Sequence, residues 1–262
     1  MGLRHFAPAG LNHLVQWQSR FRAVGFDRRR ALRATLSRPM RRTLVESRIE
    51  HLPTALRGDL EFVVDVGANA GQWLSAFMVY ANVRRLKAFE PNPEAFLELK
   101  RLLHNRSGAR LHNFALGDEH TTLNLNVMQN SFLSSALTAT EVIRREYATD
   151  ARVIKQVPVK VFPLDYVLSE EIPIDLMKID VQGFEHQVLR GARKALQRTR
   201  AVLIETNFVS HYLGDGSFGT LFSHLDELGF DFWDVSSPYR GSARQALWAD
   251  AVFLNRSLKQ SA

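Results

Sequence analysis

The 262-residue chain has no cysteine and no apolar run of the roughly 18 residues that a membrane-spanning helix requires. The missing cysteines exclude disulfides and thiolate metal sites, and they are compatible with a reducing compartment. The N-terminus also lacks the compact apolar centre of a secretory signal. We therefore expect a soluble, cytoplasmic protein, whose 45% of hydrophobic residues can form one large domain with a substantial core.

Lysine is absent from residues 1–57 and acids are scarce there, but this segment holds twelve arginines against Asp27, Glu46 and Glu50, a net charge of +9. Because the whole chain carries +7, the remaining 205 residues sum to −2. The basic character of the protein therefore belongs to its N-terminal segment. We call residues 1–57 the basic arm.

Apolar residues recur at helical spacing in the basic arm, as at Val45, Ile49, Leu52 and Leu56. This spacing predicts a basic helical extension over 1–57, followed by the main domain over 58–262. Three roles stay open for the arm: a helical cap on the main domain, a surface for an anionic membrane, glycan or lipid-linked substrate, or an oligomer interface. The second role would hold the protein at the inner membrane face. Because no aromatic-plus-basic motif accompanies the charge, we do not expect a nucleic-acid partner.

The main domain begins with the stretch EFVVDVGANAGQWLSA, residues 61–76. Its apolar run predicts a buried parallel strand that Asp65 interrupts near its end, and Gln72 begins a helix. Gly67 and Gly71 allow the backbone between these elements to turn sharply and to lie close to a ligand. The pattern indicates a nucleotide-type site. The alternative is an ordinary strand–turn–helix unit with a salt-bridged acid.

The glycine spacing of this turn differs from the G-x-G-x-x-G pattern of dinucleotide-binding folds. A carboxylate at Asp65 would repel a pyrophosphate, and it suits a ligand with a positive ammonium or sulfonium group. Residues 86–89 predict a second strand, and Glu90 follows it 25 residues beyond Asp65. This is near the distance at which an acid meets ribose hydroxyls in wound α/β folds. The two features together favour S-adenosylmethionine (SAM).

Strands and helices continue to alternate downstream. A third strand is predicted over 110–116, and its end at Ala115 and Leu116 would lie beside an adenine. Residues 121–170 interrupt the alternation, because two segments with apolar residues at every second position predict an antiparallel addition to the sheet. The polar loop 131–135 between these segments is either a substrate lid or a plain solvated loop.

Two later strands are each predicted to end in an acid. Asp180 follows the apolar segment 174–179, and Glu205 follows the apolar segment 201–204. The carboxyl ends of strands face the crevice where ligands bind in open α/β sheets, so Asp180 is the first catalytic candidate. Asp180 and Glu205 could share a metal ion, or one of them could act as a base. The next candidates for a base are His186 and His211.

The motifs DVGANAG, AFEPNP, NFALGD, PLDYVL, KIDVQGFEHQVLRGA and IETN occur in this order between about residues 61 and 207. With them, the chain resembles the FkbM family of SAM-dependent methyltransferases. The resemblance implies a Rossmann-like α/β sheet of seven strands, the last antiparallel, and methyl transfer to a hydroxyl oxygen. It implies a methionine-side loop and a ribose site built from Asp65, Gly67, Asn69, Gly71, Glu90 and Asn92, with Ala68 and Pro91 as chain neighbours.

The same resemblance places Asp180 and Glu185 in the acidic block of the family. Gln182 stands there at a position where many members have a glutamate. This departure argues against Gln182 as a base or as a strong metal ligand. The basic arm lies outside the resemblance.

From these observations we expect a SAM-dependent O-methyltransferase that acts on a sugar hydroxyl of a glycan, glycolipid or glycosylated metabolite. The hydroxyl proton must be removed by a base, directly or with the help of a metal ion, and Asp180 is the leading candidate. Three alternatives stay open. They are a polyketide-type small-molecule hydroxyl as acceptor, a SAM-binding protein without turnover that is recruited by its basic arm, and methylation of RNA.

Overall fold

The computed structural model describes residues 51–168 and 172–258. Most of the basic arm lies outside the described residues, so the division at residue 57 and the predicted helices of the arm stay predictions. The described end of the arm contains the short 3-10 turn η2 (Thr54–Leu56), and Leu52 and Leu56 are buried in the core of the main domain. Among the described residues, no helix is long and apolar enough to cross a membrane.

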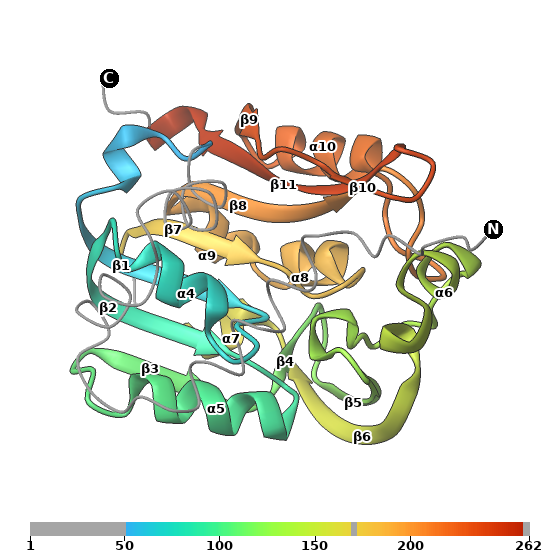
Figure 1. The fold of residues 1–262 in the computed structure, drawn as a ribbon. Coiled ribbons are helices and arrows are strands. Elements are labelled where there is room, and N and C mark those ends of the chain that lie inside the picture. The colour runs from blue at the N-terminus through green and yellow to red at the C-terminus, as the bar shows by residue number, and fades with distance from the viewer. Residues whose placement is uncertain (1–50, 169–171, 259–262) are drawn as a thin grey trace, which may run out of the picture. The chain divides into compact units, whose positions relative to one another are not determined.

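The main sheet has the strand order β10-β11-β8-β7-β1-β2-β3, and β9 also pairs with β11 (Figure 1). The strands are β1 (Asp59–Val66), β2 (Asn82–Phe89), β3 (Ala109–His112), β7 (Ile174–Ile179), β8 (Thr199–Asn207), β9 (Phe230–Val235), β10 (Tyr239–Arg240) and β11 (Ala246–Asn255). Strands β3, β2, β1, β7 and β8 run parallel to their neighbours, and β11 runs antiparallel to β8. The predicted seven-stranded sheet is confirmed, and β10 adds a short strand beside β11.

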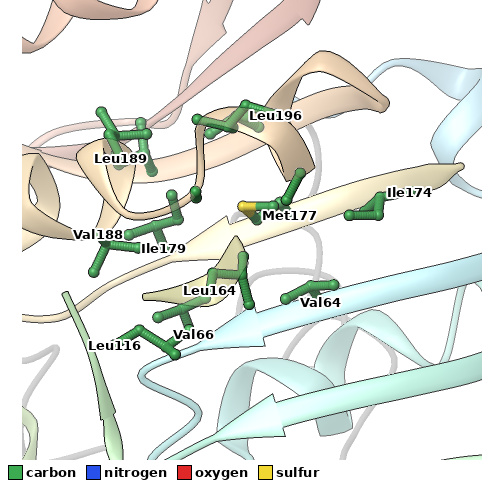
Figure 2. Packing of buried hydrophobic residues seen from close by; sticks show 14 of the residues in the cluster. Val64, Val66, Leu116, Leu164, Ile174, Met177, Ile179, Val188, Leu189 and Leu196 are labelled. Atoms are coloured by element: carbon green, nitrogen blue, oxygen red, sulfur yellow. The ribbon is translucent and has the colours of Figure 1, made fainter. Parts of the chain in front are cut away.

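Helices cover both faces of this sheet, because its central strands are apolar on both sides. One face packs against α7 (Leu164–Val167), α8 (Glu185–Arg190), α9 (Arg193–Gln197) and α10 (Phe218–Glu227). The other face packs against η2, α4 (Gln72–Phe77) and α5 (Pro93–Leu103). Figure 2 shows Val64, Met177 and Leu196 in the first of these two layers. Each such fully buried aliphatic side chain contributes about 1.5–3 kcal/mol to folding.

A second, three-stranded sheet lies beyond the carboxyl ends of the central strands (Figure 1). It consists of β4 (Ala115–Leu116), β5 (Thr121–Met128) and β6 (Val153–Phe162), with β5 antiparallel to β6. The connection from β5 to β6 contains η3 (Ser131–Leu133), α6 (Glu141–Tyr147) and η4 (Ala148–Ala151). The predicted antiparallel pair within residues 121–170 is therefore confirmed.

Two expected boundaries are wrong. The predicted third strand over 110–116 is two strands in different sheets, because β3 pairs with β2 whereas Ala115 and Leu116 of β4 pair with β6. Glu205 does not follow its strand but lies inside β8, since the pairing with β11 continues to Asn207. The chain ends its described part with the 3-10 turn η5 (Arg256–Leu258).

Candidate functional site

The turn after β1 is held against the end of β2 by backbone hydrogen bonds. The amides of Gly67 and Ala68 both donate to the carbonyl oxygen of Phe89, at 3.0 Å each. Gly67 and Gly71 have positive φ angles, which a glycine adopts without strain, and Asn69 between them also has a positive φ. The sequence predicted a sharp turn with glycines at positions 67 and 71, and the structure confirms it.

Glu90 closes the same turn from the end of β2. Its Oε2 accepts a hydrogen bond from the amide of Asn69 at 2.7 Å, and its Oε1 accepts one from the amide of Asn92 at 2.8 Å. Burial raises the pKa of Glu90 to about 7, although both backbone donors oppose that rise. A carboxylate offers about four lone-pair positions, so each oxygen of Glu90 can accept one more hydrogen bond. These acceptors fit the two hydroxyls of a ribose.

The residues around Glu90 complete this part of the site. Asn92 is buried and caps α5, because its Oδ1 accepts from the amide of Glu94 at 3.1 Å. The side chain of Asn113 donates to the carbonyl oxygens of Glu90 and Pro91, at 2.8 and 3.2 Å. Ala115 and Leu116 lie in β4, so the site edge that they were predicted to form belongs to the second sheet.

Asp65 lies beneath the turn rather than on its surface. Its side chain is 0% exposed, and its nearest cation is Lys178, with 3.5 Å between Nζ and Oδ1. Burial raises the pKa of Asp65 to about 6, and the charge of Lys178 opposes that rise. The sequence argument placed this acid directly against a cationic ligand. In the structure, Asp65 instead shares a buried cation with the catalytic candidate.

Lys178 is the cation that connects these groups. Its ammonium lies 3.1 Å from Oδ2 of Asp180 and donates to the carbonyl oxygen of Gly67 at 3.1 Å. Burial alone would lower the pKa of Lys178, but Asp180 and Asp65 outweigh burial and raise it. Sequence reasoning missed this residue, although a lysine inside a buried strand is itself a sign that a buried acid is near.

A regular change along the strands explains why the charged groups meet. On the sheet face that packs against α4, the apolar residues of three strands give way to charged ones toward the carboxyl ends. The change runs from Val63 to Asp65 in β1, from Leu176 to Lys178 and Asp180 at β7, and from Leu203 to Glu205 in β8. Side chains two residues apart share a face of a strand, so these polar groups line one side of the sheet.

Asp180 is partly accessible, with 28% of its side chain exposed. Its Oδ1 accepts a hydrogen bond from Nε2 of Gln182 at 2.9 Å. The same Nε2 donates to Oε1 of Glu205 at 2.8 Å. The structure therefore brings Asp180 and Glu205 together through one amide. Burial and then the charge of Asp180 raise the pKa of Glu205 well above its usual range, which favours its neutral form.

Gln182 and Tyr212, which the sequence argument did not propose as site residues, surround the two acids. The hydroxyl of Tyr212 lies 2.9 Å from Oε1 of Gln182 and 3.0 Å from the carbonyl oxygen of Leu133. Glu185 braces the turn that carries Gln182, because its Oε1 accepts from the amides of Val181 and Gly183 at 3.1 and 3.2 Å. Glu185 is thus a buried structural acid, and burial raises its pKa to about 7.

The two histidine candidates make other contacts. Nδ1 of His186 lies 3.3 Å from Nδ1 of His224, and Nε2 of His186 lies 3.2 Å from the hydroxyl of Thr220, both of which belong to α10. His211 is buried, and its Nδ1 lies 2.8 Å from the carbonyl oxygen of Val209. Burial lowers the pKa of both histidines. Their described contacts give Asp180 the stronger claim to act as the base.

The loop 131–135 connects the two halves of the site. The hydroxyl of Ser131 donates to Oδ1 of Asn69 at 3.2 Å, and the hydroxyl of Ser135 donates to the carbonyl oxygen of Gln182 at 2.6 Å. The loop thus joins the turn after β1 to the turn after β7, and its role as a substrate lid stays a prediction.

The donor set argues against a metal ion at the two acids. Within the described residues, no group of three or more histidine, cysteine, aspartate or glutamate side chains could hold a metal ion. Between Asp180 and Glu205, the amide nitrogen of Gln182 presents hydrogens rather than lone pairs. The residues present therefore do not fit the metal site that the sequence left open.

The sheet order, the glycine turn after β1 and the carboxylate after β2 define a class I SAM-dependent methyltransferase. A family model described as "Methyltransferase FkbM domain" matches residues 65–232, which is more than half of the chain. The chain belongs to the FkbM methyltransferase family, and SAM is its methyl donor.

Curated relatives agree with this assignment. "Methyltransferase 1" of Beauveria bassiana (strain ARSEF 2860) is 31% identical over 186 residues, which cover 66% of this chain and 73% of the relative. The "31-O-demethyl-FK506 methyltransferase FkbM" of Streptomyces tacrolimicus is 28% identical over 200 residues, with the same two coverages of 66% and 73%. Among solved structures, a methyltransferase FkbM from Methylobacillus flagellatus KT matches with a TM-score of 0.49 and 17% identity, over 75% of this chain and 44% of that chain.

Proposed function

We propose that the protein transfers the methyl group of SAM to a hydroxyl oxygen, and that the acceptor hydroxyl belongs to a sugar of a glycan, glycolipid or glycosylated metabolite. The observation that carries the proposal is the position of Asp180. It is a partly exposed carboxylate at the carboxyl end of β7, oriented by Lys178 on one oxygen and by Gln182 on the other. Such a group can accept a proton from a hydroxyl placed beside it.

The chemistry that bound SAM supplies is a methyl group activated on a positively charged sulfur. Asp180 would accept the proton that the acceptor hydroxyl loses when its oxygen receives this methyl group. Glu90 and the turn after β1 would bind the cofactor, and the loop 131–135 would exclude water over the two acids. Orientation of the acceptor supplies much of the acceleration in such a transfer.

Aromatic rings next to the acids support a sugar as acceptor. Tyr147 and Tyr239 stack with ring centroids 5.8 Å apart, and Tyr239 and Trp248 stack at 5.5 Å. Nε1 of Trp248 donates to the hydroxyl of Tyr147 at 2.9 Å. Trp248 pairs with Asn207 of β8, two residues beyond Glu205, which places the cluster near the acids. Burial is the main cause of the raised pKa of Tyr147, and the charge of Glu205 adds to it. Apolar aromatic walls with a few fixed polar groups are typical of small-ligand sites.

A small-molecule hydroxyl is the second candidate acceptor. The observation that favours it is the name of the Streptomyces tacrolimicus relative, which describes a methyltransferase of 31-O-demethyl-FK506. That name refers to an oxygen as the methylated atom, in agreement with the proton acceptor proposed for this chain.

The test is a screen for transfer of labelled methyl groups from SAM by the full chain. A cell-envelope glycan extract and a panel of hydroxylated small molecules serve as acceptors, and the variant D180N serves as the control. O-methyl sugars in the hydrolysed glycan, absent with D180N, would support the sugar acceptor. Label only in small molecules would favour the second candidate, and label on nitrogen or on RNA would contradict O-methylation of either.

We also propose that the basic arm brings the protein to an anionic membrane surface at the cytoplasmic face. Its net charge of +9 supports this, because each basic residue near an anionic leaflet contributes about 1 kcal/mol of attraction. Sedimentation of the full chain with phosphatidylcholine vesicles, with and without phosphatidylserine, tests the proposal. Binding that needs phosphatidylserine and weakens with salt is expected, and equal binding to both vesicles would contradict it.

A further inference from the structure

The side-chain amide of Gln182 occupies the place between two carboxylates where a bridging cation could otherwise lie. Its nitrogen is 2.9 Å from Oδ1 of Asp180 and 2.8 Å from Oε1 of Glu205. A primary amide has two N–H hydrogens, so one hydrogen can serve each acid. Two acids held this close would otherwise have to share a proton or a cation, because like charges disfavour joint ionisation.

The orientation of the amide is fixed from its other end. The oxygen of Gln182 is the atom that could bind a cation, but it lies 2.9 Å from the hydroxyl of Tyr212 and is turned away from the acids. On the far side of Asp180, the ammonium of Lys178 supplies a fixed positive charge at 3.1 Å. Lys178 thus offsets the charge of Asp180, and the neutral amide of Gln182 supplies a hydrogen bond to each acid.

The backbone of Gln182 is held in an uncommon conformation to place this amide. Its φ angle is +55°, in the left-handed region, which costs a residue with a side chain roughly 1–2 kcal/mol. The hydroxyl of Ser135 fixes the carbonyl oxygen of Gln182, and Glu185 fixes the amides on both sides of it. A strained residue that its surroundings hold so firmly is typical of a functional site.

We infer that Gln182 is a positioning residue that joins Asp180 to Glu205 in place of a divalent metal ion. Replacing its amide nitrogen by an oxygen would put a third carboxylate at the same point. Carboxylate oxygens are the ligands that Mg²⁺, Ca²⁺ and Mn²⁺ prefer, so the change Gln182→Glu should create a cation site where the protein now has none. A catalytic role for Asp180 and Glu205 rests on the proposed function, whereas the prediction of a cation site in Q182E does not depend on it.

Calorimetric titration of Mn²⁺ into the full chain tests the inference without an acceptor substrate. The wild type should give no saturable binding at the acids. Q182E should bind Mn²⁺ at least about tenfold more tightly than the wild type, a difference of roughly 1.4 kcal/mol. The double variant Q182E/E205Q should lose that gain. Saturable binding by the wild type that D180N or E205Q removes would overturn the inference, and so would a folded Q182E that gains no affinity.

A second variant separates the amide from the backbone strain. Glycine accepts a positive φ, so Q182G removes the amide without adding backbone strain, and any fall in its unfolding temperature reports the hydrogen bonds lost to Asp180 and Glu205. With labelled SAM and the glycan extract, Q182G should lose at least about tenfold in the rate of methyl transfer at unchanged SAM affinity, and EDTA should leave the wild-type rate unchanged. Wild-type activity in Q182G, or loss of wild-type activity in EDTA, would overturn the inference. If the wild type transfers no methyl group, the proposed function fails while the Mn²⁺ titrations still decide the inference.

Discussion

The carbonyl oxygen of Asp180 lies against the α-carbon of Gly67, so that a β-carbon added to the glycine would be 1.8 Å from this oxygen. The amide of Asp180 also donates to the carbonyl oxygen of Val66 at 3.0 Å. The turn proposed to bind the cofactor and the strand end that carries the proposed base are therefore in direct contact. A change in one of them must displace the other.

The substitution Gly67→Ala should be severely destabilising and should abolish SAM binding. The added carbon meets backbone atoms that cannot move aside, and the φ angle of +77° is strained for alanine. Gly214→Ala is the matched control, since Gly214 has a φ of +85° with nothing within 4 Å. The control should cost only about 1–2 kcal/mol. Urea unfolding and calorimetry with SAM measure both effects, and equal losses in the two variants would contradict the contact.

The substitution Asp180→Asn should remove methyl transfer and leave SAM affinity nearly intact. A general base contributes about 10²–10⁴-fold to a rate, and an asparagine cannot accept the hydroxyl proton. Asp118→Asn is a suitable control, because Asp118 pairs at the surface with Arg190. Turnover with labelled SAM and calorimetric SAM binding are the measurements. Unchanged turnover in D180N would reject Asp180 as the base.

The substitution Lys178→Met should lower the free energy of unfolding by about 3–5 kcal/mol. The lysine is buried between Asp65 and Asp180, and its loss leaves two acids without their cation. Lys155→Met is the control, because Lys155 pairs with Glu94 at the surface, where an ion pair contributes less than about 1 kcal/mol. Urea denaturation compares the two variants. A loss in K178M no larger than that in K155M would show that the buried ion pair does not stabilise the fold.

The stabilisation that three buried acids contribute should fall as the pH rises from about 4 to 7, whereas His186 and His211, whose pKa values burial lowers, contribute the opposite slope. Burial raises the pKa of Asp65 to about 6, and those of Glu90 and Glu185 to about 7. The folded chain therefore keeps these protons at pH values where the unfolded chain has released them. The stabilisation is full below the pKa values of the unfolded acids and is lost as the pH passes the raised ones.

Glu185→Gln should reduce the loss of unfolding free energy between pH 4 and pH 7 by about 1–3 kcal/mol. The substitution removes the buried ionisable group and keeps an oxygen for the two backbone amides. Glu141→Gln is the control, since the side chain of Glu141 is 84% exposed. Urea unfolding at several pH values gives the slopes. If the free energy of unfolding of E185Q changes with pH as it does in the wild type, Glu185 is not a source of the pH dependence.

Much of the fold could be predicted from the sequence, because apolar runs ending in glycine or in an acid mark the central strands. Gly67, Glu90 and Asp180 were identified by this local signal. The division of residues 110–116 was not, since Ala115 leaves the main sheet to pair with Val161. No local pattern encodes a partner that lies so far along the chain.

The site could be predicted where a residue lies at or near the carboxyl end of a strand. Lys178 lies inside an apolar strand, and its meaning depends on Asp65, a neighbour in space that is far away in sequence. Tyr212 contacts Gln182 from the loop that follows β8, and no hydrophobic periodicity in the sequence predicts this contact. Gln182, which the family resemblance argues against as a base or strong metal ligand, instead hydrogen-bonds both acids and lies against Tyr212.

The position of β1 at the centre of the sheet also affects how the chain is made. Its partners are β2, which follows at once, and β7, whose Leu176 pairs with Val63. At a synthesis rate of roughly 5–20 residues per second, the ribosome completes β7 on the order of ten seconds after β1. During that interval one apolar edge of β1 stays unpaired, which is the kind of edge that recruits a second chain. Chains that stop between β2 and β7 should therefore aggregate, whereas chains that reach the end of β11 should not, because β11 then covers the remaining apolar edge of β8.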